Sequence, residues 1–91
     1  MALIMVSYDL HSKKAEDYQD LTDAVEQHGD SCVLRVLHST WLIHTSDSPS
    51  DVKNHLRSCF KTNDSFLVNK FTKPKAGWLP EKDWAWINER I

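Results

Sequence analysis

An unbroken apolar run at the start of the chain, followed by an aspartate, constrains its fold more than any other feature. Residues 1–6 read Met-Ala-Leu-Ile-Met-Val, and Asp9 comes three positions later. The run is too short to cross a bilayer, which takes about 20 apolar residues. It shows no polar alternation, so we expect a β-strand that is covered on both faces. That strand ends on a carboxylate at a sheet edge, where a cation or a phosphate can approach.

The size and the charge of the chain narrow the range of functions. Its 91 residues suffice for one domain. With 11 basic and 13 acidic residues, the formal charge is −2. This balance argues against a protein that coats nucleic acid by bulk electrostatics, although a local basic patch is compatible with it.

The two cysteines, Cys32 and Cys59, fit a cytoplasmic protein. The apolar start has neither the basic region nor the small-residue cleavage site of a signal peptide. Both cysteines fall on apparently apolar faces, so we expect reduced core residues, with a structural disulfide as the alternative. The C-x-x-C spacing typical of metal ligation is absent from the sequence.

Hydrophobic spacing predicts the element order β-α-β-β-α-β. Apolar residues recur at helical intervals through 15–28, and Ser48-Pro49 starts a second helix with apolar positions up to Phe60. The β-prone segments are 31–37, 40–45 and 65–71. This order is that of the ferredoxin-like α+β fold, in which a four-stranded antiparallel sheet carries both helices on one face. We assign this domain to residues 1–72.

The second face of such a sheet also needs a cover. Because residues 3–6 leave neither face of the first strand polar, another copy of the same sheet is the simplest cover, and we expect a homodimer. Residues 73–91 form a C-terminal extension in which Pro80 opens a short helix. Three of the four tryptophans, Trp78, Trp84 and Trp86, lie there. We expect this extension to pack on the domain or on the dimer partner, with base stacking or docking of another protein as alternatives.

Asp9 is the leading candidate for chemistry. One carboxylate is a poor magnesium site, because the ion takes six oxygen ligands from carboxylates, waters and substrate phosphates. A two-fold axis near the strand end would bring two copies of Asp9 together, and these could support metal-assisted hydrolysis of a phosphodiester. Alternatively, Asp9 caps the following turn through backbone amides.

Several basic residues are candidates for contacts with a nucleic acid. His11, Lys13 and Lys14 follow Asp9 directly, and His11 could transfer a proton because histidine titrates near neutrality. Arg35 interrupts an apolar strand and needs a partner or an open edge. The remaining candidates recur every four residues on the second helix: Lys53, Arg57 and Lys61. Each of these assignments has an alternative. The segment after Asp9 could be a solvated loop without a ligand. The three basic residues of the second helix, which we call the basic ridge, could instead be attracted to the acidic first helix.

These motifs resemble those of the small CRISPR-associated Cas-two proteins. Ser7-Tyr8-Asp9-Leu10 is similar to the signature that ends the first strand of that family. The segment 35–41 resembles its R-V-x-x-S stretch, and Asp64-Ser65 resembles the turn into its fourth strand. The resemblance covers residues 1–71, and the virulence-associated protein D ribonucleases share this fold.

The resemblance implies a ferredoxin-like homodimer whose paired Asp9 carboxylates bind magnesium. It also implies one of two activities. Some members of the family are metal-dependent endonucleases that cleave RNA or DNA, and others are non-catalytic scaffolds that hold DNA beside an integrase. A toxin-like ribonuclease that acts on cellular RNA is a third alternative. We expect no association with a membrane.

Overall fold

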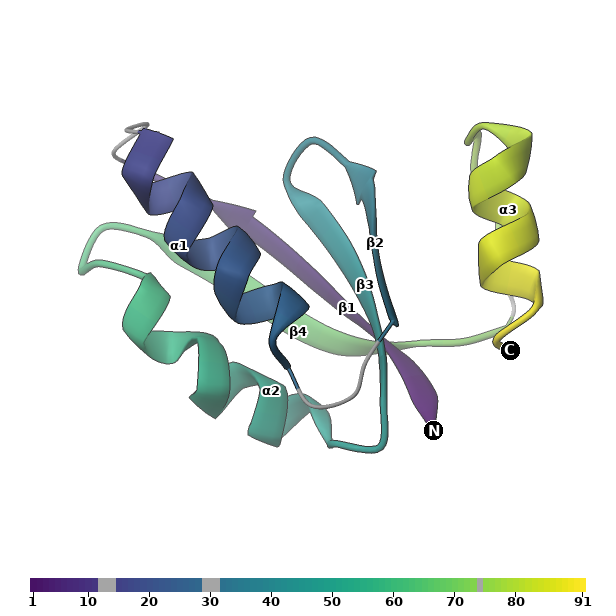
Figure 1. Ribbon diagram of the computed structural model, residues 1–91, viewed down its shortest axis with the longest axis horizontal. Helices are drawn as coiled ribbons and strands as arrows, with labels where there is room; N and C mark the ends of the chain where they lie inside the picture. Colours follow the sequence, from purple (N-terminus) through teal and green to yellow (C-terminus); the bar gives the residue numbers. More distant parts are fainter. Residues whose placement is uncertain (12–14, 29–31, 74) are drawn as a thin grey trace.

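The computed structural model describes residues 1–11, 15–28, 32–73 and 75–91. Three α-helices and four strands make up the fold, with β2 and β3 directly in succession (Figure 1), and a short 3-10 helix, η1, follows the second α-helix. The elements are β1 (Ala2–Asp9), α1 (Ala15–Glu26), β2 (Cys32–Leu37), β3 (Thr40–Thr45), α2 (Pro49–Leu56), η1 (Arg57–Cys59), β4 (Ser65–Phe71) and α3 (Glu81–Asn88).

The four strands form one antiparallel sheet in the order β2-β3-β1-β4. The first and third strands therefore occupy the centre, as the ferredoxin-like arrangement requires. Ile4 lies opposite Ile43 of β3, and Val6 lies opposite Val68 of β4. The structure confirms the predicted α+β fold, and the predicted bounds of β3 and β4 are those observed.

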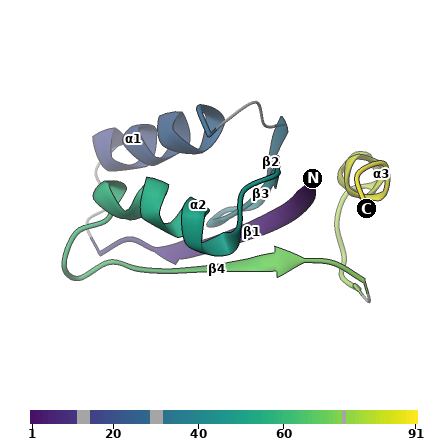
Figure 2. The ribbon, with the colours of Figure 1, turned by 90° about the horizontal axis from the view of Figure 1, so that it is seen from below.

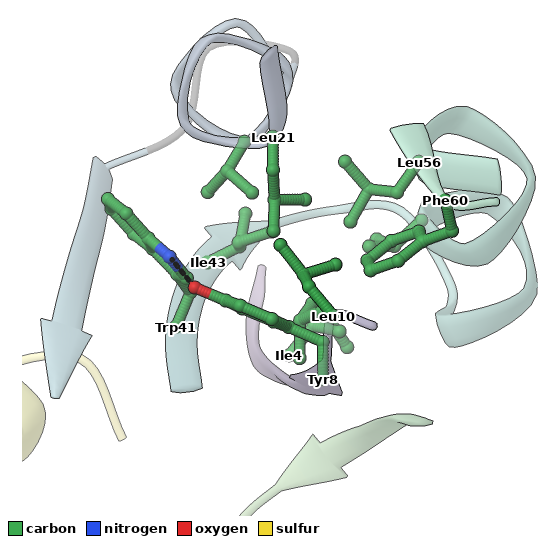
Figure 3. Close-up of a cluster of buried hydrophobic side chains, with 11 residues drawn as sticks. Ile4, Tyr8, Leu10, Leu21, Trp41, Ile43, Leu56 and Phe60 are labelled. Atoms are coloured by element: carbon green, nitrogen blue, oxygen red, sulfur yellow. Dashed lines mark hydrogen bonds between the residues drawn. The ribbon is translucent and has the colours of Figure 1, made fainter. Parts of the chain in front are cut away.

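The main core lies between the sheet and the pair formed by α1 and α2, which cover the same face (Figure 2). Leu21 and Val25 of α1 and Leu56 of α2 are fully buried there. Tyr8 and Trp41 also lie in this core, where the indole Nε1–H of Trp41 donates to the Tyr8 hydroxyl oxygen at 3.1 Å (Figure 3). The hydrogen bond satisfies two polar groups that would otherwise be costly to bury.

A second core lies on the opposite face, which we call the helix-free face because α1 and α2 leave it uncovered. Helix α3 stands apart from these two helices (Figure 2). Its Ile87 packs with Leu3 and Leu42, and each of these three residues is at most 1% exposed. The C-terminal extension thus provides, from the same chain, part of the cover that the sequence led us to expect from a second copy.

Helix α2 begins with a reciprocal pair of cap hydrogen bonds and ends earlier than the sequence predicts. The Ser48 side chain accepts from the Asp51 backbone N–H, and the Asp51 carboxylate accepts from the Ser48 N–H. The α-helix stops at Leu56, η1 follows, and Phe60 is extended. The Phe60 ring enters the core and stacks on Phe66, with ring centroids 4.1 Å apart. This burial requires the chain to leave the helix.

The two cysteines have different environments, and both are free. Cys32 is exposed on the edge strand β2, so the expectation of a core residue was wrong there. Cys59 packs against the main core, and burial, followed by the charge of Asp20, raises the pKa of its thiol. Among the described residues, no helix combines the length and the apolar character that a bilayer span requires.

Candidate functional site

Asp9 stands on the helix-free face of the sheet. Side chains alternate along a strand, so Asp9 shares this face with Leu3, Met5 and Ser7. Leu3 is buried in the core beneath α3, whereas Asp9 is exposed. Its neighbour on β4 is Ser65. The carboxylate therefore lies at the end of the helix-free face that α3 leaves uncovered.

Two turns from distant parts of the chain lie beside the end of β1. The backbone N–H of Tyr8 donates to the Ser39 carbonyl at 3.1 Å, in the turn between β2 and β3. The backbone N–H of His11 donates to Asp64 Oδ1 at 2.7 Å, in the turn before β4. Asp9 thus lies between these two turns. His11 follows it closely, with an exposed side chain.

Asp64 is a structural carboxylate at this edge. Its Oδ2 accepts the backbone N–H of Lys61 at 2.8 Å, while Oδ1 accepts that of His11. These two hydrogen bonds, the Lys61 one first, hold the pKa of Asp64 below its ordinary value. Asp64 therefore stays ionised and fixes the chain after Asp9 to the turn before β4. The sequence pattern indicated Asp64 only as part of a turn motif, and this role was not visible in it.

A single protomer does not fit a magnesium ion at this edge. Of the two carboxylates, Asp64 already uses both oxygens for backbone N–H groups. Asp9 alone gives too few of the oxygen ligands that magnesium takes. Within the described residues, no group of three or more His, Cys, Asp or Glu side chains is placed to hold a metal. A site at Asp9 therefore needs ligands from outside the protomer.

Arg35 does not share the face of Asp9. It lies opposite Trp41, whose side chain belongs to the core under α1 and α2. It is also on the edge strand β2, which β3 separates from β1. Its Nε and Nη2 donate to the His38 carbonyl at 3.1 and 2.6 Å. Arg35 therefore stabilises the turn next to the Asp9 edge, in which the His38 side chain is exposed.

The predicted basic ridge divides into two parts. Lys53 and Arg57 line a shallow groove of about 380 Å³ between α2 and β4, on the helix side of the sheet. Lys61 comes after η1, outside that groove, and its backbone N–H binds Asp64. Lys13 and Lys14 lie outside the described residues. The structure thus brings His11 and Lys61 to the Asp9 edge and places Lys53 and Arg57 on the other side.

Two further groups of polar residues were missed from the sequence. Lys70, Lys73 and Lys75 line one groove where β4 leads into the C-terminal extension. Buried His28 lies with its Nε2 2.7 Å from Asp47 Oδ2. The lysines were visible as a basic cluster in the sequence, whereas His28 and Asp47 are far apart along the chain and carried no such signal.

No family model matches this chain.

Proposed function

We propose that the chain acts as a Cas-two-like homodimer, in which two Asp9 carboxylates bind magnesium and support cleavage of RNA or DNA phosphodiesters. The observation that carries this proposal is the position of Asp9. It is exposed, at a strand end, on the part of the helix-free face that α3 leaves open. A second copy docked there would bring a second carboxylate to the first.

The need for two copies follows from the ligands that magnesium takes. Two carboxylates, with waters and a phosphate oxygen, form a common kind of site for this ion. When bound, magnesium would polarise the phosphodiester and lower the pKa of an attacking water. Asp64 would hold the loop after Asp9 in place through the His11 backbone.

The other candidate residues have roles around this pair of carboxylates. The His11 side chain is exposed two positions after Asp9, so it can donate or accept a proton at the phosphodiester. Lys13 and Lys14 continue that segment and would contact phosphates. Arg35 would act through the turn that it stabilises. A cytoplasmic location belongs to the same proposal and agrees with two free cysteines.

The second candidate is a non-catalytic dimer that binds nucleic acid, alone or beside an integrase-type partner. The groove with Lys53 and Arg57 favours this candidate, because it offers two cations on the opposite side of the sheet from Asp9. The groove with Lys70, Lys73 and Lys75 adds three more. Phosphate contacts of this kind position a nucleic acid without any chemistry.

The test compares the wild type with Asp9→Asn on single-stranded RNA and on duplex DNA, with and without magnesium. Glu26→Gln, an exposed carboxylate on α1, is the matched control. We expect magnesium-dependent cleavage by the wild type and the control and a loss of at least 100-fold in Asp9→Asn, on the order of the effect of one essential group.

Equal cleavage by Asp9→Asn and the wild type would contradict the catalytic proposal. Binding without cleavage by any of the proteins would support the second candidate. In that case, Lys53→Gln should reduce the slope of log affinity against log salt by about 0.7–0.9, the value for one lost phosphate contact.

A further inference from the structure

Trp78 is the most exposed large apolar residue of the described chain. It lies in the segment between β4 and α3, and it is 99% exposed. Tryptophan is highly buried on average, because its indole ring gains more from burial than almost any other side chain. Leu37, at the end of β2, is 56% exposed. Both residues border the same cavity on the helix-free face.

That cavity has a volume of about 210 Å³ and a largely apolar lining. Thr40 is the one lining residue with an aliphatic hydroxyl, and the others include Met5, Leu42, Phe71, Leu79, Trp84 and Ile87. A dry apolar cavity of about 150 Å³ accepts benzene, so this one is of the right size for the two fused rings of an indole. The chain thus presents an unburied indole next to a cavity that an indole would fill.

We propose that Trp78 of each copy inserts into this cavity of a second copy, so that the cavity is the docking site of a symmetric homodimer. This inference rests on the homodimer of the proposed function and names the contact that forms it. In a two-fold contact, a residue on one copy meets its receiving surface on the other, and the reverse holds at the same time. Because Trp78 itself borders the cavity, one axis near Trp78 can satisfy both insertions.

The area of this contact suits a weak dimer. Two tryptophan side chains bury about 300–500 Å², and the surfaces that receive them lose a similar area. The sum, about 600–1,000 Å², approaches the lower limit of specific interfaces, which is about 1,000 Å². Leu37 on each copy adds to this area. We therefore expect association in the micromolar range, with Trp78 as its dominant contact.

The composition of the lining favours an indole over a nucleobase. A base would bring several polar edge groups into a cavity whose lining is largely apolar, and burial of polar groups without partners is unfavourable. The position also agrees with the proposed function. Thr40 pairs with Ser7, two residues before Asp9 on the same face. A second copy docked at the cavity would therefore cover the same face of the sheet that carries Asp9.

Sedimentation velocity of the full chain over a concentration series tests this inference. We expect a monomer–dimer equilibrium for the wild type and a dissociation constant at least 10-fold larger for Trp78→Ala. Asn54→Ala is the control, because Asn54 is exposed on α2, on the other side of the sheet, and does not line the cavity. We expect a change of less than 3-fold for this control. Circular dichroism verifies that the variants fold, since both side chains are exposed.

A mixing experiment tests the reciprocity of the contact. Leu37→Glu places a charge at the border of the cavity but keeps Trp78, whereas Trp78→Ala removes one bordering side chain but keeps the apolar floor of the cavity. Each variant alone loses both insertions. A mixture of the two restores one insertion, so we expect the mixture to associate more tightly than either variant alone. Association of the mixture no tighter than that of each variant would overturn the proposal.

The outcomes separate this inference from the proposed function. Dimerisation of Trp78→Ala with wild-type affinity, together with cleavage that depends on Asp9, would overturn the inference alone. Loss of dimers in Trp78→Ala, with no cleavage by the wild type, would support the inference and contradict the chemistry. A wild type that stays monomeric at every concentration would overturn both. Reduced binding of single-stranded nucleic acid by Trp78→Ala, with unchanged association, would assign Trp78 to base stacking and overturn the inference.

Discussion

Asp9 and Asp64 lie at the same edge of the sheet but have different surroundings. Asp64 accepts two backbone N–H groups, and this fixes its position and its charge. Asp9 is exposed at the strand end, and no other group within the described residues donates a hydrogen bond to its side chain. Asp64 is therefore suited to holding the loop in place, and Asp9 is suited to binding a ligand that arrives from outside.

The lowered pKa of Asp64 predicts a pH-dependent contribution to stability. A carboxylate whose pKa is lower in the folded state stabilises the protein above its ordinary pKa of 3.8 and loses that effect as the pH falls through the folded value. In Asp64→Asn, one of the two N–H groups loses its acceptor. We expect the variant to unfold at lower urea concentration than the wild type at pH 7, and the gap to close below about pH 4.

Urea unfolding of both proteins between pH 7 and pH 3 measures this difference. The control is Asp23→Asn, which alters an exposed carboxylate on α1. A gap between the wild type and Asp64→Asn that stays constant down to pH 3 would contradict the assigned role of the Asp64 charge.

At the scale of elements, α3 determines how much of the helix-free face stays open. Ile87 is fully buried against Leu3 and Leu42. Trp86 packs on the same cluster, and the guanidinium carbon of Arg90 lies 4.1 Å from the centroid of the Trp86 ring. This arrangement orders the end of the chain and limits the open part of the face to the region near Asp9.

Truncation of Ile87 should therefore destabilise the whole domain. We expect Ile87→Ala to lower the free energy of unfolding by about 2–5 kcal/mol, the usual cost of a cavity in a packed core. Asn88→Ala, an exposed neighbour on the same helix, is the control and should change it by less than about 0.5 kcal/mol. Urea unfolding measures both. Equal effects of the two substitutions would show that α3 does not support the sheet.

The sequence predicted the strands and the helix starts well, because these signals are local. The apolar run of β1 and the Ser48-Pro49 start of α2 are examples. The end of α2 was predicted poorly, because Phe60 leaves the helix to stack on Phe66, a contact that spacing does not reveal. The face of Arg35 was also beyond the sequence. It depends on pairing with Trp41, and the register of β2 and β3 shifts just after this pair.

The position of Asp9 was predictable because one strand end determines it, whereas contacts between distant segments were missed. Asp9 follows directly from the end of β1. The link between His11 and Asp64 joins residues 53 positions apart, so local patterns carry no information on it. For the same reason, the sequence showed that the helix-free face of β1 needs a cover but not that Ile87 would provide part of it.

At the scale of the whole molecule, the helix-free face has a covered end and an open end. Helix α3 covers the end with Leu3, where the cavity beside Trp78 lies between α3 and the sheet, while Asp9 occupies the open end. Leu67, opposite Ser7 on β4, is exposed there as well. An apolar surface next to an exposed carboxylate is what a second copy would need in order to bring two Asp9 side chains together.

Thiol crosslinking at position 9 tests this arrangement most directly. The protein carries Asp9→Cys in a background with Cys32→Ser and Cys59→Ala, and a short bifunctional thiol reagent is added. Ser50→Cys, an exposed position on α2, is the control in the same background. We expect covalent dimers from Asp9→Cys at protein concentrations where the wild type associates, and none from Ser50→Cys. Dimers from the control alone, or from neither protein while the wild type is dimeric, would contradict the facing pair of Asp9 residues.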